Sequence, residues 1–485
     1  MELKQAFNPY LPSWEYIPDG EPHVFGDRVY VYGSHDKFNA PIFCVNDYVC
    51  WSAPVNDLSD WRCEGVIYRK NQDPKNRMGL RLLFAPDACR GPDGRYYLYY
   101  AFDFMGIMGV AVCDTPAGEY QFLGHVHYPD GTAWGRRKGD QLPFDPGVLV
   151  DNDGRVWLYS GFYTHVPAIV TGGRKLRNDG GTVVELERDM ITLKGEPKII
   201  FPKEGPGSFP NHEFFEASSI RKDGDKYIFV YSSRHNHELC YAVSDKPDGG
   251  FAFGGTLVSQ GDLFLDGNED EKKALNYLGN THGGLLKLGG QWYIFYHRQT
   301  NRHSYSRQAC AERLEQNPDG SFRQAEVTSC GLNGGPLRGE GRYEARIACN
   351  LWSKDGAGRY DCPNPRKAFA AHPYFTQTGN DREEDGDQYI ANMRDGAVAG
   401  FKYFDIHQIK TVTVGLGGAA QGEFLLSSTP NFLPVSACIP VKLTEGRAEF
   451  SAPCTLADGV CALYFKFQGT GYVNFHFFSL KGDAE

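Results

Sequence analysis

The sequence lacks the features that mark several large classes of protein. Its thirteen cysteines include no C-x-x-C pair, and their odd number leaves no complete disulfide framework. No apolar run reaches the roughly 18 residues of a membrane span, and the first residues show no basic stretch followed by an apolar one. We therefore expect a cytoplasmic protein with reduced thiols and no membrane partner.

Clusters of basic charge are also scarce. The formal net charge is −10 at pH 7 and is spread along the chain without long runs. Nucleic acids and anionic membranes both require a basic face, so the sequence predicts neither as a partner. The acidic segment at residues 381–387 is interpreted as a solvated loop rather than a metal site. A neutral or mildly polar ligand agrees best with this charge.

Helical periodicity is rare in this chain, and its composition is typical of β-rich proteins. Aromatic residues make up 14% of the sequence and glycine occurs 57 times. With 485 residues the chain is too long for one ordinary core. The composition therefore predicts an all-β protein with more than one domain.

A hairpin pattern at residues 17–36 is repeated along the first two thirds of the chain. It consists of Asp19, a short apolar run, a Gly26-Asp27 turn and an alternating strand. The layout returns at near-constant intervals in GPDGRYYLYY, DNDGRVWLYSG, RKDGDKYIFVYSS and KLGGQWYIFYHR. These intervals fit units of four strands with generous loops, which predicts a five-bladed β-propeller over residues 1–340. Residues 8–12 are expected to close the ring.

The pattern changes after about residue 340. Glycine and proline interrupt the chain, and short, evenly spaced strands follow without a sixth hairpin of the same type. This arrangement is typical of a β-sandwich, which we expect over residues 341–485.

Each of the five repeats carries a polar residue eight to ten positions before its second strand: Asp19, Asp87, Asp145, Glu216 and His282. In a propeller the first strand of each blade runs along the central axis, so these residues converge at the mouth of the channel. Carboxylates that converge in a partly desolvated site raise one another's pKa, so one can stay protonated while another is charged. Glycoside hydrolysis requires that combination of acid and base.

Aromatic residues also gather near these positions, namely Phe84, Phe144, Phe162 and Phe215. Two interpretations are open, because such rings either stack on sugars or pack between blades. We take Phe84 as a candidate substrate-binding residue.

Residues 8–328 resemble glycoside hydrolase family 43, the five-bladed propeller glycosidases. The matching stretches are NPYLP, PDGEPHVFGDRVYVYGSHD, LFAPDACRGPDGRYYLYY, FDPGVLVDNDGRVWLYSG, FFEASSIRKDGDKYIFVYSS and NTHGGLLKLGGQWYIFYHR. The resemblance implies that Asp19 is the general base, Asp145 in FDP modulates the pKa of the acid, and Glu216 in FFEAS is the general acid. No cofactor is then required for the chemistry.

The resemblance also implies roles for three surrounding residues. His282 falls on the central histidine that in many members binds, directly or through water, a calcium or other ion in the channel. Arg307 in YSRQ falls on an arginine that reaches a substrate hydroxyl, and Asp87 in APD on a substrate-pocket position. One departure is that Gly20 rather than proline follows Asp19, whereas Pro22 follows Glu21, so Glu21 is a second candidate for the base.

The stretch GVCALYFKFQGTGYVNFHFFSLK is similar to the closing strands of a family 6 carbohydrate-binding module, which leaves a sugar-binding or a purely structural role open. The resemblances together imply an inverting, exo-acting glycoside hydrolase that removes a terminal pentose, as an α-L-arabinofuranosidase or β-xylosidase. The alternatives are a β-galactofuranosidase or other exo-glycosidase of the same fold, and a non-catalytic glycan-binding propeller. The presence of Asp19, Asp145 and Glu216 together favours an enzyme.

Overall fold

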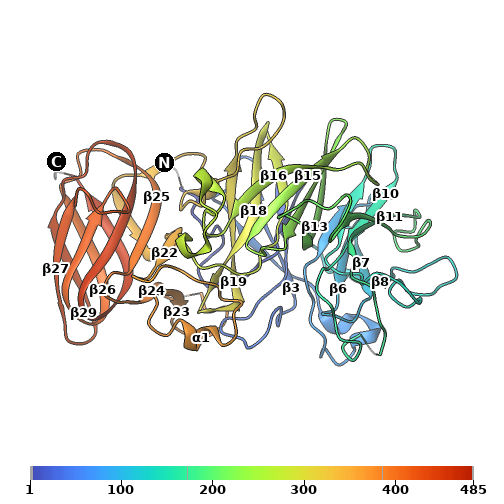
Figure 1. The fold of residues 1–485 in the computed structure, drawn as a ribbon, viewed down its shortest axis with the longest axis horizontal. Helices are drawn as coiled ribbons and strands as arrows, with labels where there is room; N and C mark the ends of the chain where they lie inside the picture. Colours follow the sequence, from blue (N-terminus) through green and yellow to red (C-terminus); the bar gives the residue numbers. More distant parts are fainter. Residues whose placement is uncertain (1–3, 172, 385, 483–485) are drawn as a thin grey trace.

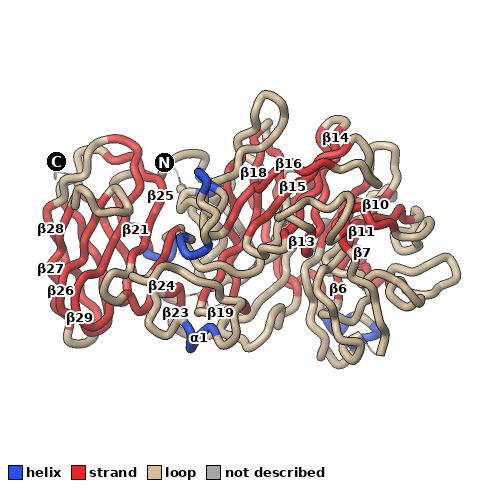
Figure 2. Tube along the Cα trace, in the orientation of Figure 1, coloured by secondary structure: helices blue, strands red, loops and turns tan. Residues whose placement is uncertain are grey.

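The computed structural model describes residues 4–171, 173–384 and 386–482, which form a β-propeller followed by a sheet-rich domain (Figure 1). Strands dominate both parts, and the helical segments are short (Figure 2). The described helices are α1 (Pro365–Ala368) and the 3₁₀ turns η1 (Lys70–Gln72), η2 (Pro74–Asn76), η3 (Leu265–Gly267), η4 (Glu271–Lys273), η5 (Gly331–Asn333) and η6 (Ala345–Ile347). No described helix has the length and apolar character that crossing a bilayer would take.

Five separate antiparallel sheets form the blades, which confirms the predicted propeller. The first contains β1 (Glu21–Phe25), β2 (Arg28–Tyr32), β3 (Tyr48–Pro54) and β4 (Arg62–Tyr68). The second contains β5 (Asp87–Arg90), β6 (Tyr96–Ala101), β7 (Met108–Cys113) and β8 (Gln121–His125). The third contains β9 (Gly147–Val150), β10 (Val156–Ser160), β11 (Gly180–Leu186) and β12 (Lys198–Pro202). The fourth contains β13 (Phe214–Asp223), β14 (Lys226–Ser233), β15 (Glu238–Ser244) and β16 (Ala252–Ser259).

The fifth blade has three strands rather than four, β17 (Leu285–Leu288), β18 (Gln291–Thr300) and β19 (His303–Leu314). Backbone near the N-terminus lies along its outer strand, because the Tyr10 amide donates to the Ala309 carbonyl at 3.2 Å. The Asn8 side chain binds both backbone groups of Ala311, at 2.9 and 3.0 Å. The beginning of the chain therefore closes the ring onto the last blade, as expected from the sequence.

The first strands of the blades contact one another in a ring, in the order β1, β5, β9, β13, β17 and back to β1. They are therefore the innermost strands. Apolar layers fill the space between neighbouring blades, and the layer between the third and fourth blades includes Phe201 stacked on Phe229 with ring centroids 4.3 Å apart. This packing accounts for much of the aromatic content.

The second domain consists of β20 (Leu337–Arg338), β21 (Gly341–Glu344), β22 (Asn350–Trp352), β23 (Tyr374–Gln377), β24 (Gln388–Met393), β25 (Val398–Ile406), β26 (Thr411–Ser427), β27 (Ala437–Leu443), β28 (Arg447–Pro453) and β29 (Gly459–Lys481). The long strands β26 and β29 pair along their lengths, and the core includes Phe401, Phe465, Phe475 and Phe478. A β-sandwich was expected here. The boundary at residue 340 stays a prediction, since β20 already pairs with β25.

Two residues of the acidic segment that we predicted to be a solvated loop, Asp381 and Arg382, instead contact the propeller, and residue 385 of this segment lies outside the described residues. Asp381 accepts hydrogen bonds from the Phe38 amide at 2.7 Å and from the Asn46 side chain at 3.1 Å, both in the propeller. Arg382 pairs with the buried carboxylate of Glu15 at 2.7 Å. A buried carboxylate needs a compensating cation, so this segment links the two domains.

All thirteen cysteines are unpaired in the structure. Several lie in buried strands, where the thiol behaves as a small apolar group.

Candidate active site

A pocket of about 180 Å³ lies where the inner strands begin. Asp19, Asp145, Glu216, His282 and Arg307 line it together. Its remaining wall is formed by the aromatic residues Phe43, Phe84, Phe104, Phe144, Phe162 and Phe215, with Ala85, Asn236 and Asn280. The structure therefore brings together four of the five polar residues that the repeats predicted to converge. Arg307 and Phe84, the other two predicted substrate-binding residues in this region, line the same pocket.

The backbone has an unusual conformation at or beside three of the residues that line the pocket. Asp19 precedes β1 and Asp145 precedes β9, and both have a positive φ, of 58° and 47°. Glu216 lies at an irregularity of β13, next to Ala217 with a φ of 68°. Non-glycine residues rarely adopt this conformation, and it occurs preferentially at functional sites.

Asp19 is held in its ionised form. Burial alone would raise its pKa, but the guanidinium of Arg307, 2.9 Å from Oδ1, and the nearby histidines lower that pKa below its usual value. Arg307 is in turn bound by both oxygens of Asp36, at 2.8 and 3.0 Å. This bidentate pair fixes the guanidinium beside Asp19.

Glu216 shows the opposite shift. Desolvation in the pocket and the charges of Asp145 and Asp19 hold the pKa of Glu216 well above its usual value. Burial also raises the pKa of Asp145, whose Oδ2 accepts a hydrogen bond from the Ala217 amide at 3.1 Å. The pocket thus pairs a carboxylate whose pKa is lowered, Asp19, with a carboxyl whose pKa is raised, Glu216, so the two favour opposite protonation states.

His282 lies between two carboxylates. Its Nδ1 is 3.5 Å from Asp145 Oδ2 and its Nε2 is 3.7 Å from Glu21 Oε1. Burial alone would lower the pKa of His282, but these carboxylates raise it well above its usual value. The two carboxylates therefore favour the imidazolium form of the ring, whose charge balances that of its neighbours.

These contacts do not fit a calcium ion beside His282. The Arg221 guanidinium binds Glu21 Oε2 at 2.8 Å, and Gly284 leaves room for this pair, because a Cβ there would lie 2.3 Å from the same oxygen. Calcium takes six to eight oxygen ligands, and one of the two Glu21 oxygens beside His282 is already bound by the Arg221 guanidinium.

Two sequence-based expectations are wrong. Asp87 does not line the pocket: it is fully buried, and its oxygens are occupied by His23 and by the Ala88 and Val148 amides, each at 2.7 Å. It therefore links the first three blades. Glu21 does not line the pocket either, and its pairing with Arg221 excludes it as the competing base.

Several residues of the site were missed by sequence reasoning. Phe43 and Asp36 lie in or beside the connection between β2 and β3, whereas Asn236 and Asn280 lie in loops of other blades. None of them occupies a repeated position, so the hairpin pattern held no signal for them. The shared stretch at residues 17–36 did include Asp36.

Comparisons with known proteins identify the family of this chain. The model of the family "Glycosyl hydrolases family 43" matches residues 17–322. A "Xylosidase/arabinosidase" from Thermoclostridium stercorarium is 50% identical over 486 residues, covering 99% of this chain and 100% of that protein. A "Beta-D-galactofuranosidase" from Aspergillus niger is 26% identical over 353 residues, covering 69% and 88%. The solved structure of an exo-beta-1,3-galactanase from Phanerochaete chrysosporium has a TM-score of 0.51 at 12% identity and covers 96% of both chains, so it shares the fold.

Proposed function

This chain belongs to glycosyl hydrolase family 43, and from that premise we propose that it is an inverting, exo-acting enzyme that releases a terminal pentose from plant-type oligosaccharides or polysaccharides. The proposed activities are α-L-arabinofuranosidase and β-xylosidase. The name of the Thermoclostridium stercorarium relative, which matches nearly the whole chain, supports them. The small pocket supports exo action, because about 180 Å³ is below the roughly 300–1,000 Å³ typical of drug-sized ligands and suits one terminal ring.

One observation carries this proposal: the pKa values of Asp19 and Glu216 are shifted in opposite directions within one pocket. The ionised Asp19 acts as the general base, taking a proton from a water that attacks the anomeric carbon. Glu216 acts as the general acid, giving its proton to the glycosidic oxygen as the bond to the leaving group breaks. Both protons are thereby accounted for, and water is the only co-reactant.

A panel of 4-nitrophenyl α-L-arabinofuranoside, β-D-xylopyranoside and β-D-galactofuranoside tests the substrate class. Release of 4-nitrophenol from either of the first two is expected. Release from the galactofuranoside alone would favour the alternative that the Aspergillus niger relative suggests. Release from none would point to a glycan-binding propeller without catalysis.

Asp145→Asn is expected to shift the alkaline limb of the pH–rate profile toward lower pH. The charge of Asp145 is one cause of the raised pKa of Glu216, so removing that charge lowers this pKa and the acid loses its proton earlier. The profile of kcat/KM measured across the pH range checks this. Asp145→Glu keeps the charge and is the matched control, with a limb nearer that of the wild type. An unmoved limb combined with a higher KM would instead indicate that Asp145 only binds substrate.

Removal of divalent cations is expected to leave activity unchanged, because Arg221 and protonated His282 already balance Glu21 and Asp145. Dialysis against EDTA should alter neither kcat/KM nor Tm, and added calcium should restore nothing. A loss on chelation that calcium reverses would mean that an ion does bind near His282.

We also propose a cytoplasmic location, which the thirteen unpaired cysteines support, since thiols persist in a reducing compartment. The substrate is then an oligosaccharide that enters the cell. For the second domain we propose a structural role toward the propeller, supported by the pairing of Arg382 with buried Glu15.

A further inference from the structure

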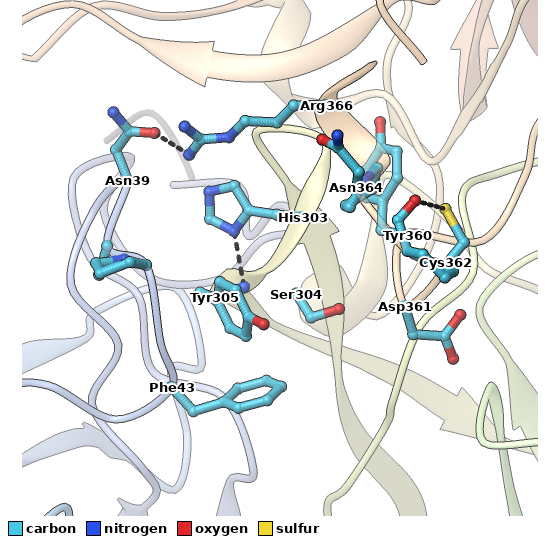
Figure 3. A pocket seen from close by; sticks show the side chains of 14 residues that line it. Asn39, Phe43, His303, Ser304, Tyr305, Tyr360, Asp361, Cys362, Asn364 and Arg366 are labelled. Carbon is cyan, nitrogen blue, oxygen red and sulfur yellow. Dashed lines mark hydrogen bonds between the residues drawn. The ribbon is translucent and has the colours of Figure 1, made fainter. Parts of the chain in front are cut away.

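A second and larger cavity, of about 600 Å³, lies between the two domains. The propeller contributes residues 39–41, Phe43 and the turn between β18 and β19, and the second domain contributes residues 360–366, including the start of α1 (Figure 3). We call it the interdomain cleft. Its volume lies within the range of pockets that hold a ligand larger than one sugar ring.

The interdomain cleft adjoins the catalytic pocket on two sides. Phe43 lines both cavities, and its ring lies 4.7 Å from that of Tyr305 in the cleft and 4.8 Å from the guanidinium of Arg307 in the pocket. Asn236, which lines the pocket, reaches Asp361 in the cleft at 3.5 Å. A chain whose terminal unit occupies the pocket would therefore continue into the cleft.

His303 presents an unused hydrogen-bond donor in the cleft wall. Its side chain is 97% buried, and its Nδ1 accepts a hydrogen bond from the Tyr305 amide at 2.9 Å (Figure 3). Since burial lowers the pKa of His303 to about 3, the ring is neutral and its one proton lies on Nε2. That nitrogen has no hydrogen-bond partner among the described residues. A buried donor without an acceptor is costly, so an acceptor on a bound molecule in the cleft would be favourable at this nitrogen.

The other polar groups of the cleft suit a neutral ligand rich in hydroxyl groups. The Tyr360 hydroxyl is also buried and without a partner among the residues described. Arg366, which donates to the Asn39 side chain, and Asp361 supply one charge of each sign (Figure 3). The two charges offset each other, so the wall does not favour an anionic ligand. The hydroxyl groups of a neutral ligand could bind both its donors and its acceptors, and the ring of Tyr305 offers an apolar face for a sugar.

We propose that the interdomain cleft binds the leaving-group side of the substrate, an oligosaccharide of at least two further sugar units, through residues of both domains. This inference rests on the proposed function, because it presumes that the terminal sugar is cleaved in the pocket. It gives residues 360–366 of the second domain a direct part in substrate recognition.

The test compares two substrates of one bond type, xylotetraose and 4-nitrophenyl β-D-xylopyranoside, and in parallel an arabinosyl-substituted xylotriose and 4-nitrophenyl α-L-arabinofuranoside. The quantity measured is the ratio of kcat/KM for the oligosaccharide to that for the aryl pentoside. Arg366→Ala and His303→Asn are the variants, since Asn keeps an acceptor for the Tyr305 amide and removes the Nε2 donor. Lys367→Ala, an exposed residue of α1 outside the cleft lining, is the matched control.

The ratio should fall about tenfold in Arg366→Ala and in His303→Asn, as expected for loss of one strong hydrogen bond, and should not change in Lys367→Ala. Because each variant is its own reference, a general loss of stability lowers both rates and leaves the ratio intact. Ratios within twofold of the wild type in both variants would overturn the proposal that the cleft binds substrate, while leaving the proposed function standing. Absence of aryl pentoside turnover in the wild type would overturn both.

Discussion

Glu216→Gln is expected to slow hydrolysis of xylotetraose and arabinosyl-xylotriose by about 10²–10⁴-fold, the usual contribution of general acid catalysis. A sugar alkoxide is a poor leaving group and needs a proton, and the raised pKa of Glu216 favours the protonated form that can supply it. A 4-nitrophenolate leaves without protonation, so the corresponding aryl pentosides should lose far less. Steady-state rates on the two substrate classes check the prediction.

Glu213→Gln is the matched control for this variant. Glu213 lies three residues earlier, pairs with Arg234 at 3.5 Å and does not line the pocket, so the same chemical change there should leave both rates near the wild type. If Glu216→Gln slowed both substrate classes by the same factor, Glu216 would be a binding or structural residue and another group would have to serve as the acid.

The propeller could be predicted from the sequence because its signal is local and repeated. Each hairpin brings its own turn and its own alternating strand, and the residue before each inner strand inherits a fixed place relative to the axis. That reasoning placed Asp19, Asp145, Glu216 and His282 correctly in one pocket. It failed for Asp87, because the repeat predicts the position of a residue in its blade but not the hydrogen bonds that its side chain makes with neighbouring blades.

Other features depend on contacts between distant segments, which the repeat does not encode. The sequence left Glu21 open as a second candidate for the base. Regular alternation along a strand would place residues 19 and 21 on the same side, but the positive φ of Asp19 breaks that alternation. Arg221 reaches Glu21 from the fourth blade, and Arg382 reaches Glu15 from the second domain. The interdomain cleft arises only when the domains meet, so no single stretch of sequence predicts it.

Asp19→Asn is expected to abolish turnover of oligosaccharides and aryl pentosides alike, by at least about 10²-fold. Activation of the attacking water is required whatever the leaving group, and the asparagine side chain of this variant cannot accept the proton of that water. This differs from Glu216→Gln, where a good leaving group rescues the rate, so the two variants separate base from acid. Asp27→Asn, in the exposed turn of the same hairpin, is the control and should retain both activities.

The same assignment predicts the stereochemistry. Asp19 precedes the inner strand of the first blade and Glu216 lies at the start of that of the fourth, so the two carboxyls approach the bound sugar from different blades. Residues placed in this way favour the roughly 6.5–9.5 Å separation that admits a water over the roughly 5–5.5 Å that permits direct attack. Proton NMR during hydrolysis should first detect the sugar with inverted anomeric configuration. A retained anomer, or a glycosyl group trapped on Asp19, would make Asp19 a nucleophile instead of a base.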